Sequence, residues 1–375
     1  MAESDFHILI LSSWYPTDNK PFLGNFVQRQ AQLLAGKYKV TVIHTVVDET
    51  VRSFKTKESI NDNLLEIIVK HPKKKSIFGK LRQQRKALDH GLNLMDDIDL
   101  VIGNVLLPKG HQFVAVAKHY NCPLIYVEHG SYFRPEKRNV WTITDMIILK
   151  MVKQHIKEVV AVSDFLKDDL KKDFNRFDIQ VVGNHIDTSI FSALPKNKKE
   201  ITQFLHVSTL DENTKNPTGI IEACSLLKAV TSKFKLTMIC DEEFTKWQKY
   251  VEEKGLSEHI EFIGPLEWDK LPSYYQAADA FVLFSNYESF SIVLAEAWAT
   301  GTPVISTSVG IAHNLSDQLG IQVQINNPKS LFEAMRMIVD GELEFDSVQI
   351  VAHAQNFSKK AILDKWTAII DKYVG

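Results

Sequence analysis

The 375-residue sequence has few cysteines and no long apolar run, and both features narrow the class of protein. Its cysteines, Cys122, Cys224 and Cys240, are widely spaced and match no metal or disulfide pattern, so we interpret them as reduced core residues. No apolar run approaches the roughly 18 residues that a membrane-spanning helix requires. The polar start, MAESDFHILIL, lacks the form of a signal peptide. We therefore expect a cytoplasmic protein.

The common nucleotide-binding fingerprints are also missing. Neither GxGxxG nor GxxxxGK[ST] occurs, which argues against a nicotinamide enzyme and against a P-loop phosphotransferase. The acidic pairs Asp96-Asp97 and Asp168-Asp169 fall on predicted helices and not in a suitable loop. We therefore expect no metal in catalysis and no other cofactor.

Segments that read as buried strands and amphipathic helices alternate along the chain, which predicts two doubly wound parallel sheets of the α/β class. One series runs from FHILILS to IQVVGNHI, and a second starts at QFLHVS. We expect two Rossmann-like domains that face a cleft, at residues 1–190 and 200–357, with a short basic linker at 193–200. The last amphipathic segment, about residues 358–375, is expected to pack back onto the first domain.

Positive charge is concentrated in the first half of the chain. Residues 1–190 carry 27 Lys and Arg against 22 Asp and Glu, whereas the rest carries 17 against 24. Residues 70–86 alone have eight Lys and Arg, no acid, and the interleaved apolar residues Ile77, Phe78 and Leu81. This composition suits docking on an anionic membrane surface, as a peripheral protein of the inner face of the cell membrane, although a solvated basic face is the alternative. The basic residues of this patch are Lys73, Lys74, Lys75, Lys80 and Arg82.

A nucleic-acid partner is not expected, because no nucleic-acid-binding motif accompanies the basic segment.

The stretch YESFSIVLAEAWATGTPVIS, residues 287–306, is the most informative part of the sequence. Glu288 and Glu296 stand eight positions apart in it, and the apolar run 280–284 before it predicts a buried parallel strand. The expected order is strand, loop, helix, strand, and ligands collect at the carboxyl ends of such strands. Ser289 or Ser291 could cap the helix, whose free amides suit a phosphate. The two carboxylates could then hold hydroxyls on either side of a phosphate, which suits a nucleotide-sugar.

These segments resemble the retaining glycosyltransferases of family 4, which have the GT-B fold. ESFSIVLAEAWATGTPVIST resembles their E-x7-E motif and the strand turn that follows it. SSWYPTDNKPFLGNFVQRQAQLLA resembles their N-terminal loop, and HVSTLDENTKNPTGIIEA resembles their phosphate-binding segment. AVSDFLKDDL and VVGNHIDTSIF resemble two segments at the end of their first domain, so the resemblance covers nearly the whole chain.

The resemblance implies a metal-independent hexosyltransferase of polysaccharide biosynthesis. Its donor would be a nucleotide-diphosphate sugar, in the UDP or GDP form, and its acceptor a glycan or a lipid-linked saccharide. It also implies a front-face reaction, in which the departing phosphate takes the proton of the acceptor.

Site roles follow from the resemblance position by position. Glu288 would contact the hydroxyls of the donor sugar, Glu296 the ribose diol, and Lys215 the diphosphate. Gly24 would let the backbone approach the phosphates or the reacting sugar, and His129 would lie beside the reaction centre. The catalytic candidates are thus Glu288, His129 and Lys215. The remaining donor-binding candidates are Thr209, Ser289, Phe290, Ser291 and Ile292.

One departure from the family pattern leaves other functions open. Many relatives have Gly-Arg before the lysine, where this chain has Ser208-Thr209, so one expected phosphate-binding cation is missing. The chain could therefore be a non-catalytic nucleotide-sugar-binding protein. A nucleotide-sugar 2-epimerase, which shares this architecture, is the other alternative.

Overall fold

The computed structural model describes residues 4–95, 97–176, 178–195, 200–267 and 269–374, and the chain divides into two compact units. Unit 1 consists of Met1–Val162, Lys167–Asn184 and Leu363–Gly375, and unit 2 of Ser163–Leu166 and His185–Ile362. The division thus falls between Asn184 and His185, a few residues before the boundary expected from sequence. Asp96 and residues 196–199 of the expected linker lie outside the described residues.

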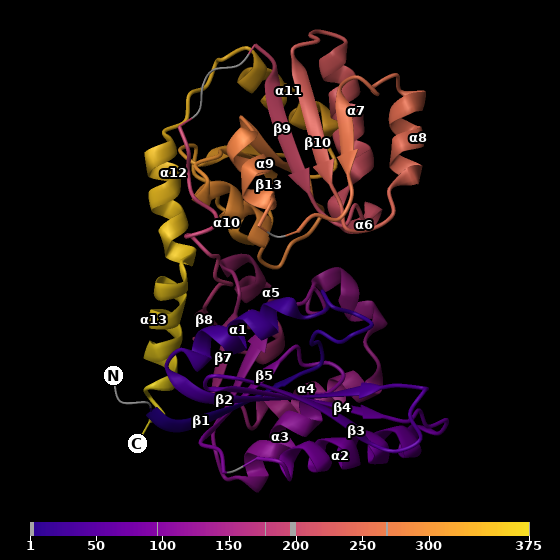
Figure 1. Cartoon of the computed structure of the whole chain (residues 1–375), viewed down its shortest axis with the longest axis vertical. Helices are drawn as coiled ribbons and strands as arrows, with labels where there is room; N and C mark the ends of the chain where they lie inside the picture. The colour runs from indigo at the N-terminus through magenta and orange to yellow at the C-terminus, as the bar shows by residue number, and fades with distance from the viewer. Residues whose placement is uncertain (1–3, 96, 177, 196–199, 268, 375) are drawn as a thin grey trace. The chain divides into compact units, whose positions relative to one another are not determined.

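Within the described residues, unit 1 forms an eight-stranded sheet in the order β3-β4-β2-β1-β5-β6-β7-β8 (Figure 1). Its strands are β1 (Ser4–Ser12), β2 (Tyr38–Val47), β3 (Lys55–Asn61), β4 (Leu64–His71), β5 (Leu100–Asn104), β6 (Leu124–Glu128), β7 (Glu158–Ala161) and β8 (Gln180–Val181). Neighbouring strands are parallel except for β3, which pairs antiparallel with β4 at the edge.

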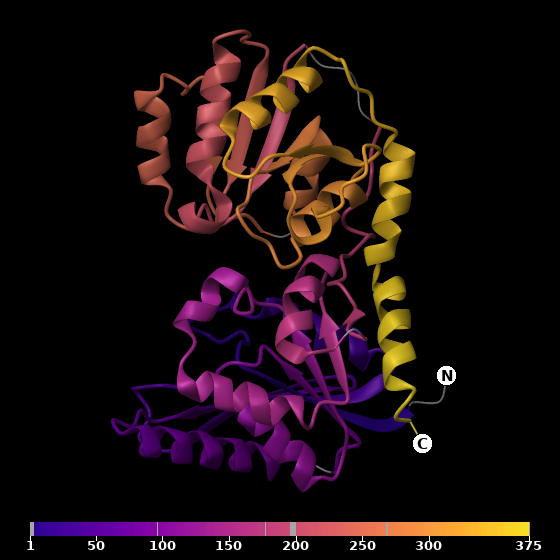
Figure 2. The same ribbon diagram turned by 180° about the vertical axis from the view of Figure 1, so that it is seen from behind.

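Helices cover both faces of this sheet. They are α1 (Asn25–Ala35), α2 (Ile77–Leu92), α3 (Gly110–His119), α4 (Ile143–Lys153) and α5 (Asp164–Phe174), with the 3-10 helix η1 (Pro135–Val140) before α4. The connections through α2, α3 and α4 all run in the same direction across the sheet, so right-handed crossovers place these helices on one face. Figures 1 and 2 show α2 and α3 on one side of the sheet and α1 on the other.

The C-terminal helix α13 (Lys359–Ile370) contributes to both units. Trp366, Ile369 and Ile370 are buried, and the hydroxyl of Tyr38 donates to Oδ1 of Asp371 over 2.9 Å within unit 1. The part of α13 from Leu363 onwards belongs to unit 1, and its first turn belongs to unit 2. Apolar side chains and polar contacts, including that of Lys372 with Glu158, therefore hold the end of the chain on unit 1.

Unit 2 forms a six-stranded sheet within the described residues, in the order β11-β10-β9-β12-β13-β14, and all its neighbouring pairs are parallel. Its strands are β9 (Thr202–Val207), β10 (Phe234–Ile239), β11 (Ile260–Ile263), β12 (Ala280–Leu283), β13 (Val304–Thr307) and β14 (Gly320–Val323). The chain proceeds outward from β9 to β11 and then returns to β12, beside β9. The strand order therefore reverses between β9 and β12, which is where ligands bind in sheets of this kind.

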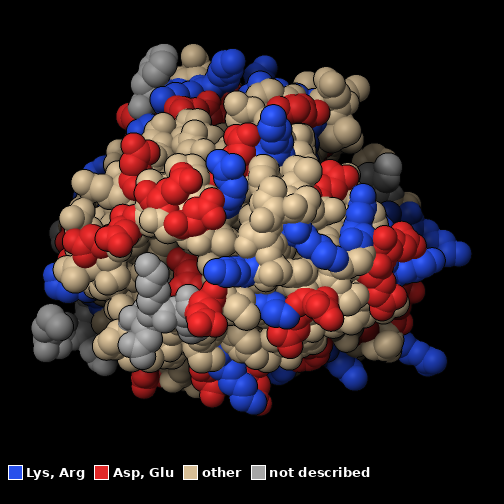
Figure 3. Space-filling view, turned by 90° about the horizontal axis from the view of Figure 1, so that it is seen from above, with Lys and Arg blue, Asp and Glu red and all other residues tan. Residues whose placement is uncertain are grey.

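The helices of unit 2 connect these strands and follow the last one. They are α6 (Glu212–Lys215), α7 (Pro217–Lys228), α8 (Thr245–Glu253), α9 (Leu271–Ala277), α10 (Ile292–Ala299), α11 (Pro328–Val339) and α12 (Ser347–Ala354), with η2 (Gly310–Ala312) and η3 (Gln355–Phe357). Seen from above in the orientation of Figure 1, unit 2 shows a gathering of acidic side chains on part of its face (Figure 3). Among the described residues of the whole chain, no helix is long and apolar enough to cross a membrane.

Candidate functional site

Two opposite charges meet at the point in unit 2 where the strand order reverses. Lys215 ends α6, which follows β9, and Glu288 lies in the loop after β12. Nζ of Lys215 lies 2.5 Å from Oε1 of Glu288, and the two side chains are only 21% and 11% exposed. Ser285 donates to the same carboxylate oxygen over 2.8 Å. The structure thus brings two of the predicted catalytic residues together as a largely buried ion pair.

Hydrogen bonds between the two loops hold this pair in place. Asp211 caps α6 by accepting from the backbone N–H of Thr214 over 2.9 Å. The backbone N–H of Asn286 donates to the carbonyl of Thr214 over 2.8 Å, and its side-chain amide donates to the carbonyl of Asn213 over 3.1 Å. The loop after β12 is therefore attached to the short helix that ends at Lys215.

A buried histidine fixes the loop that carries Thr209. Nδ1 of His206 lies 2.8 Å from the carbonyl of Val282, which can only accept, so Nδ1 carries the proton and Nε2 accepts from Ser208 over 2.7 Å. Ser208 in turn accepts from the backbone N–H of Leu210 over 3.0 Å. Burial, more than any other cause, lowers the pKa of His206 to about 4 and keeps it neutral. Thr209 is thereby held, partly exposed, just after β9.

Helix α10 begins after a strained residue. Ser291 occupies the N-cap position with φ 74° and ψ 78°, and among the described atoms its buried hydroxyl has no hydrogen-bond partner. The expected side-chain cap by Ser289 or Ser291 is therefore absent from α10. Such a left-handed backbone conformation costs a non-glycine residue about 1–3 kcal/mol and often marks a functional site.

The loop before α10 is packed tightly against the turn after β13. A Cβ on Gly310, whose φ is 53°, would lie 2.4 Å from the carbonyl oxygen of Phe290, so the contact requires glycine. The backbone N–H of Ile311 donates to that oxygen over 2.9 Å. These contacts fix Ser289, Phe290 and Ser291 next to Glu288, and the first free amides of α10 follow at Ile292.

Glu296 lies in the second turn of α10 and faces the interior of unit 2. Only 4% of the residue is exposed, and the hydroxyl of Tyr275 donates to its Oε2 over 3.1 Å. Burial and the nearby carboxylate raise the pKa of Tyr275, which therefore stays a neutral donor. Tyr275 thus occupies one acceptor position on this buried carboxylate. The contact of Glu296 with a ribose diol stays a prediction.

Unit 1 has a corresponding group of polar residues beside the β1–β5 pair, where its own strand order reverses. His129 follows β6, and its Nε2 lies 2.8 Å from Oδ1 of Asn104, the last residue of β5. The ring of Phe26 stacks on the imidazole with a centroid distance of 4.4 Å. Burial lowers the pKa of His129 to about 3, so the ring is neutral. Among the described atoms, Nδ1 of His129 and Nδ2 of Asn104 are buried without a hydrogen-bond partner. Such unpartnered buried groups are uncommon in folded proteins.

A buried carboxylate shapes the turn that presents His129. Oε1 of Glu128 accepts from the backbone N–H groups of His129 and Gly130 over 2.8 and 2.6 Å, and Tyr126 donates to the other oxygen. Burial raises the pKa of Glu128 despite these bonds. Sequence reasoning missed Glu128, Asn104 and Ser285. The available signal was a polar residue at the end of an apolar strand or directly after it.

Gly24 is required for a reason that differs from the expected one. It precedes α1 with φ 74°, and a Cβ there would lie 2.5 Å from the backbone carbon of Trp14. The close approach is thus to the protein's own backbone. A contact between Gly24 and the donor stays a prediction. The candidates therefore form two groups, with Gly24 and His129 in unit 1 and the remaining catalytic and donor-binding candidates in unit 2.

The basic patch, Lys73, Lys74, Lys75, Lys80 and Arg82, surrounds the start of α2 and is exposed. Phe78 is 85% exposed within it, and Leu81 is also exposed. The side chain of Ile77 lies outside the described residues. Lys73 pairs with Glu49 over 2.7 Å, and this partner raises the pKa of Lys73.

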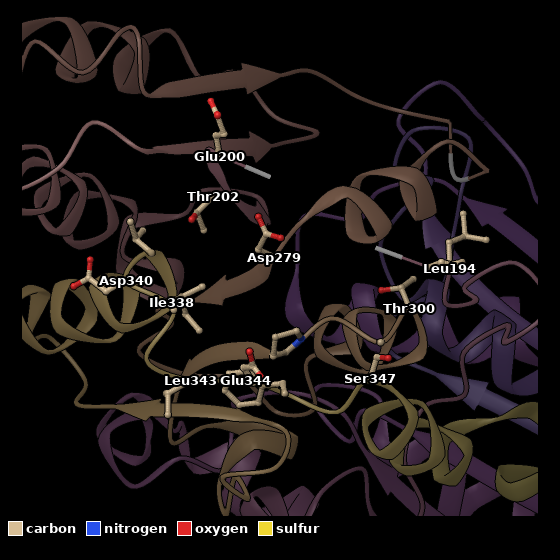
Figure 4. A pocket seen from close by; sticks show the side chains of 16 residues that line it. Leu194, Glu200, Thr202, Asp279, Thr300, Ile338, Asp340, Leu343, Glu344 and Ser347 are labelled. Carbon is tan, nitrogen blue, oxygen red and sulfur yellow. The ribbon is translucent and has the colours of Figure 1, made fainter. Parts of the chain in front are cut away.

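A pocket of about 480 Å³ lies at the other edge of the unit 2 sheet, where its strands begin (Figure 4). Thr202 at the start of β9, Asp279 before β12 and Pro303 before β13 line it. Glu200, Asp340 and Glu344 are also part of its wall. These carboxylates would repel a diphosphate, so the pocket is not a candidate donor site.

Two family models match adjoining parts of the chain. The model "Glycosyltransferase Family 4" matches residues 23–190, and "Glycosyl transferases group 1" matches residues 187–362. A D-inositol 3-phosphate glycosyltransferase of Paenarthrobacter aurescens is 24% identical over 267 residues, which are 67% of this chain and 64% of that protein. An uncharacterized glycosyltransferase of Methanocaldococcus jannaschii is 24% identical over 89% of this chain and 90% of its own length. The match thus spans less than two thirds of the Paenarthrobacter relative.

Solved structures have the same fold over nearly the whole chain. HepE of Anabaena, solved in complex with UDP, has a TM-score of 0.75 and 15% identity, with 98% of this chain and 100% of that chain covered. Sucrose-phosphate synthase from Thermosynechococcus elongatus has a TM-score of 0.73 and 16% identity, with 98% and 99% covered. Taken with the two family models, these likenesses show that the chain belongs to the family 4 glycosyltransferases and has their GT-B fold.

Proposed function

We propose that this protein transfers a hexosyl group from a nucleotide-diphosphate sugar to a saccharide or lipid-linked saccharide, with retention at the anomeric carbon and without a metal ion. The observation that carries the proposal is the Lys215–Glu288 ion pair at the point of strand-order reversal in unit 2, directly before the N-terminus of α10. A cation, a carboxylate and free amides at one sheet edge match the diphosphate and the sugar hydroxyls of such a donor.

In the proposed reaction, negative charge builds on the departing diphosphate. Lys215 and the first amides of α10 stabilise that charge in positions fixed before the reaction, so little rearrangement is needed. Glu288, held by Ser285, accepts hydrogen bonds from the sugar hydroxyls and orients the ring. Because the protein supplies the positive charge, the proposal needs no divalent cation.

His129 acts in this proposal as a neutral hydrogen-bonding group of the first unit. With Oδ1 of Asn104 as the acceptor, Nε2 carries the proton and Nδ1 is free to accept from a sugar hydroxyl. Its lowered pKa keeps it neutral throughout the physiological range. His129 would thus bind a hydroxyl of the donor or acceptor without taking a proton.

The first test is a thermal-shift screen of UDP-, GDP- and ADP-sugars. A ligand at 100 times its Kd raises the free energy of unfolding by about 2.7 kcal/mol, which raises the melting temperature. Transfer is then assayed with the donor that binds, and the anomeric coupling constant of the product, measured by proton NMR, reports retention. Isomerisation of the donor without an acceptor would support the 2-epimerase instead. Donor binding without hydrolysis or transfer would support the non-catalytic protein.

We further propose that unit 1 docks peripherally on an anionic membrane surface at the cytoplasmic side, where a lipid-linked acceptor would be reached. The exposed apolar side chains of Phe78 and Leu81 in α2 lie within the basic patch in the sequence. On the same face of the sheet, α4 exposes Ile143, Met146 and Ile147. Basic and large apolar side chains together are typical of a surface that inserts shallowly into anionic lipid.

A further inference from the structure

A second cavity, of about 340 Å³, lies in unit 1 at the carboxyl edge of its sheet. Residues after β1, at the ends of β2 and β4, and at the start of α3 line it, among them Tyr15, His44, Thr45, His71 and Lys109. Carboxyl edges of parallel strands are the usual place for ligands in such sheets. None of the catalytic candidates lines this cavity.

Lys109 gives the cavity a cation that no carboxylate neutralises. Its partly buried ammonium donates to the backbone carbonyl of Thr45 over 2.7 Å, and among the described residues no carboxylate forms an ion pair with it. The two acids of the cavity are occupied elsewhere: Asp18 pairs with Lys57 and Lys70, and Asp48 lies 3.8 Å from Lys70. Two N–H donors of Lys109 therefore remain for a ligand. Burial lowers the pKa of Lys109 to about 7, so its ammonium carries a full charge only below that pH.

Neutral hydrogen-bonding groups surround this cation. Nδ1 of His44 lies 3.2 Å from the carbonyl of Ser12, and Nδ1 of His71 lies 3.3 Å from that of Pro72, so both Nδ1 atoms carry protons and both Nε2 atoms are acceptors. Burial, as the largest cause, lowers the pKa of each ring. The hydroxyl of Thr45, a buried residue, has no hydrogen-bond partner among the described atoms. An unpartnered hydroxyl and two acceptors beside a cation fit a ligand that combines hydroxyls with an acidic group.

We propose that this cavity binds a saccharide or polyol with an acidic group, a phosphate or a carboxylate. The acidic group binds Lys109, and the hydroxyls bind Thr45, His44 and His71.

Calorimetric titration with glucose 6-phosphate, glucuronate and glucose tests the proposal. The titrations use the full chain with Lys215→Ala, so that the phosphate probe has no cation at the donor site. We expect glucose 6-phosphate or glucuronate to bind at least about tenfold more tightly than glucose, since a charge-assisted hydrogen bond contributes about 1.5–3 kcal/mol. The stronger of the two identifies the acidic group. Equal affinity for all three, or no binding of any, would overturn the proposal.

Lys109→Gln, added to the same background, should abolish the preference for the acidic probe. The matched control is Lys118→Gln, which removes an exposed lysine from the same helix and should leave the preference intact. Thr45→Val keeps the shape of the side chain and should weaken all three probes alike, and circular dichroism checks that each variant folds. If Lys109→Gln leaves the preference unchanged, the cavity is not the anion site. Failure of donor binding in the thermal-shift screen would contradict glycosyl transfer and leave these titrations unaffected.

Discussion

At the residue scale, the candidate site of unit 2 contains a largely buried pair of opposite charges, Lys215 and Glu288. Removing one partner of such a pair leaves an uncompensated charge, whereas the pair itself adds little net stability. The small net contribution of such a pair to stability agrees with the proposed donor-binding role of Lys215 and Glu288. Ser285, which donates to the same oxygen of Glu288, keeps the carboxylate oriented in the absence of a ligand.

Glu288→Gln should lower turnover by at least about 10²-fold, the magnitude typical of a lost electrostatic contact in a preorganised site. The amide keeps the shape of the side chain but loses the charge that orients the sugar hydroxyls. Steady-state rates with saturating donor, together with circular dichroism, provide the measurement. Glu261→Gln, an exposed glutamate of β11, is the matched control. Near-normal turnover of the Glu288 variant would contradict its role.

Lys215→Ala should reduce kcat/KM by about 10³-fold or more, because Thr209 stands where many relatives have a second cation and the amides of α10 would be left alone with the developing charge. Thr209→Arg in that background should restore part of the loss, since Thr209 is held at the same sheet edge. Both variants are compared by initial rates at low donor concentration. A Lys215 variant within about threefold of wild type would mean that another cation meets the phosphates.

The pKa of Lys109 predicts a pH-dependent stability difference. Its pKa is about 7 in the folded protein and about 10.4 in an unfolded chain, so between these values the unfolded state binds more protons. The contribution of Lys109 to the free energy of unfolding must therefore rise as the pH rises from about 7 to 10. Lys109→Met removes this pH-dependent contribution. In urea unfolding, the free energy of unfolding of wild type minus that of the variant should therefore increase between pH 7 and 9. A difference that stays constant with pH would contradict the buried lysine.

At the element scale, the sequence predicts helices and central strands better than edges and caps. Helix α1 is of the predictable kind, because its apolar residues recur at helical spacing between Gly24 and Gly36. The strand β3 was missed, since KTKESIN is polar and mostly exposed at the sheet edge and has no buried face to reveal it. The predicted side-chain cap of α10 is absent. The left-handed backbone of its N-cap residue, Ser291, depends on packing between distant loops, which the sequence does not show.

The candidate site was predictable to a similar extent. Glu288 could be found because its loop follows an apolar strand, whereas Lys215 was identified only through the family resemblance. The structure shows that the strands before the two loops pair with one another. Asn104 and Glu128 could not be assigned roles, because only the folded sheet shows which strand ends meet His129. The cavity of unit 1 was invisible for the same reason. Its residues come from three strand ends and a helix start that are far apart in the sequence.

The start of α2 should bind anionic vesicles. Neutralising Lys74, Lys75, Lys80 and Arg82 to Gln should weaken sedimentation with vesicles that contain phosphatidylserine, because each basic residue near such a surface contributes about 1 kcal/mol. Among single substitutions in the patch, Lys73→Gln should weaken binding least, since Lys73 already pairs with Glu49. Phe78→Ser tests the apolar contribution separately. Absence of wild-type binding at low salt would contradict membrane docking.

At the scale of the whole molecule, charge is divided between the two halves of the chain. The first 190 residues have an excess of Lys and Arg, whereas the remainder has an excess of Asp and Glu, which suits an anionic partner for the first half. In the acidic second half, an anionic donor would depend on a few local cations and amides at one sheet edge. Under the proposed function, Lys215 would thus provide an unusual share of the attraction for a diphosphate.

This dependence leads to the last prediction, which concerns metal ions. Treatment of the wild-type protein with EDTA should leave turnover within about twofold, because Lys215 and the amides of α10 already supply the positive charge that a divalent ion would otherwise provide. The described residues include no group of three His, Cys, Asp or Glu side chains that could hold such an ion.

The Lys215→Ala variant should respond to metal ions differently, because Mg²⁺ or Mn²⁺ bound to the diphosphate of the donor could replace part of the lost charge. We expect added Mg²⁺ to raise the activity of that variant and not that of wild type. Loss of wild-type activity in EDTA, with recovery on addition of Mg²⁺, would instead assign the charge stabilisation to a metal ion.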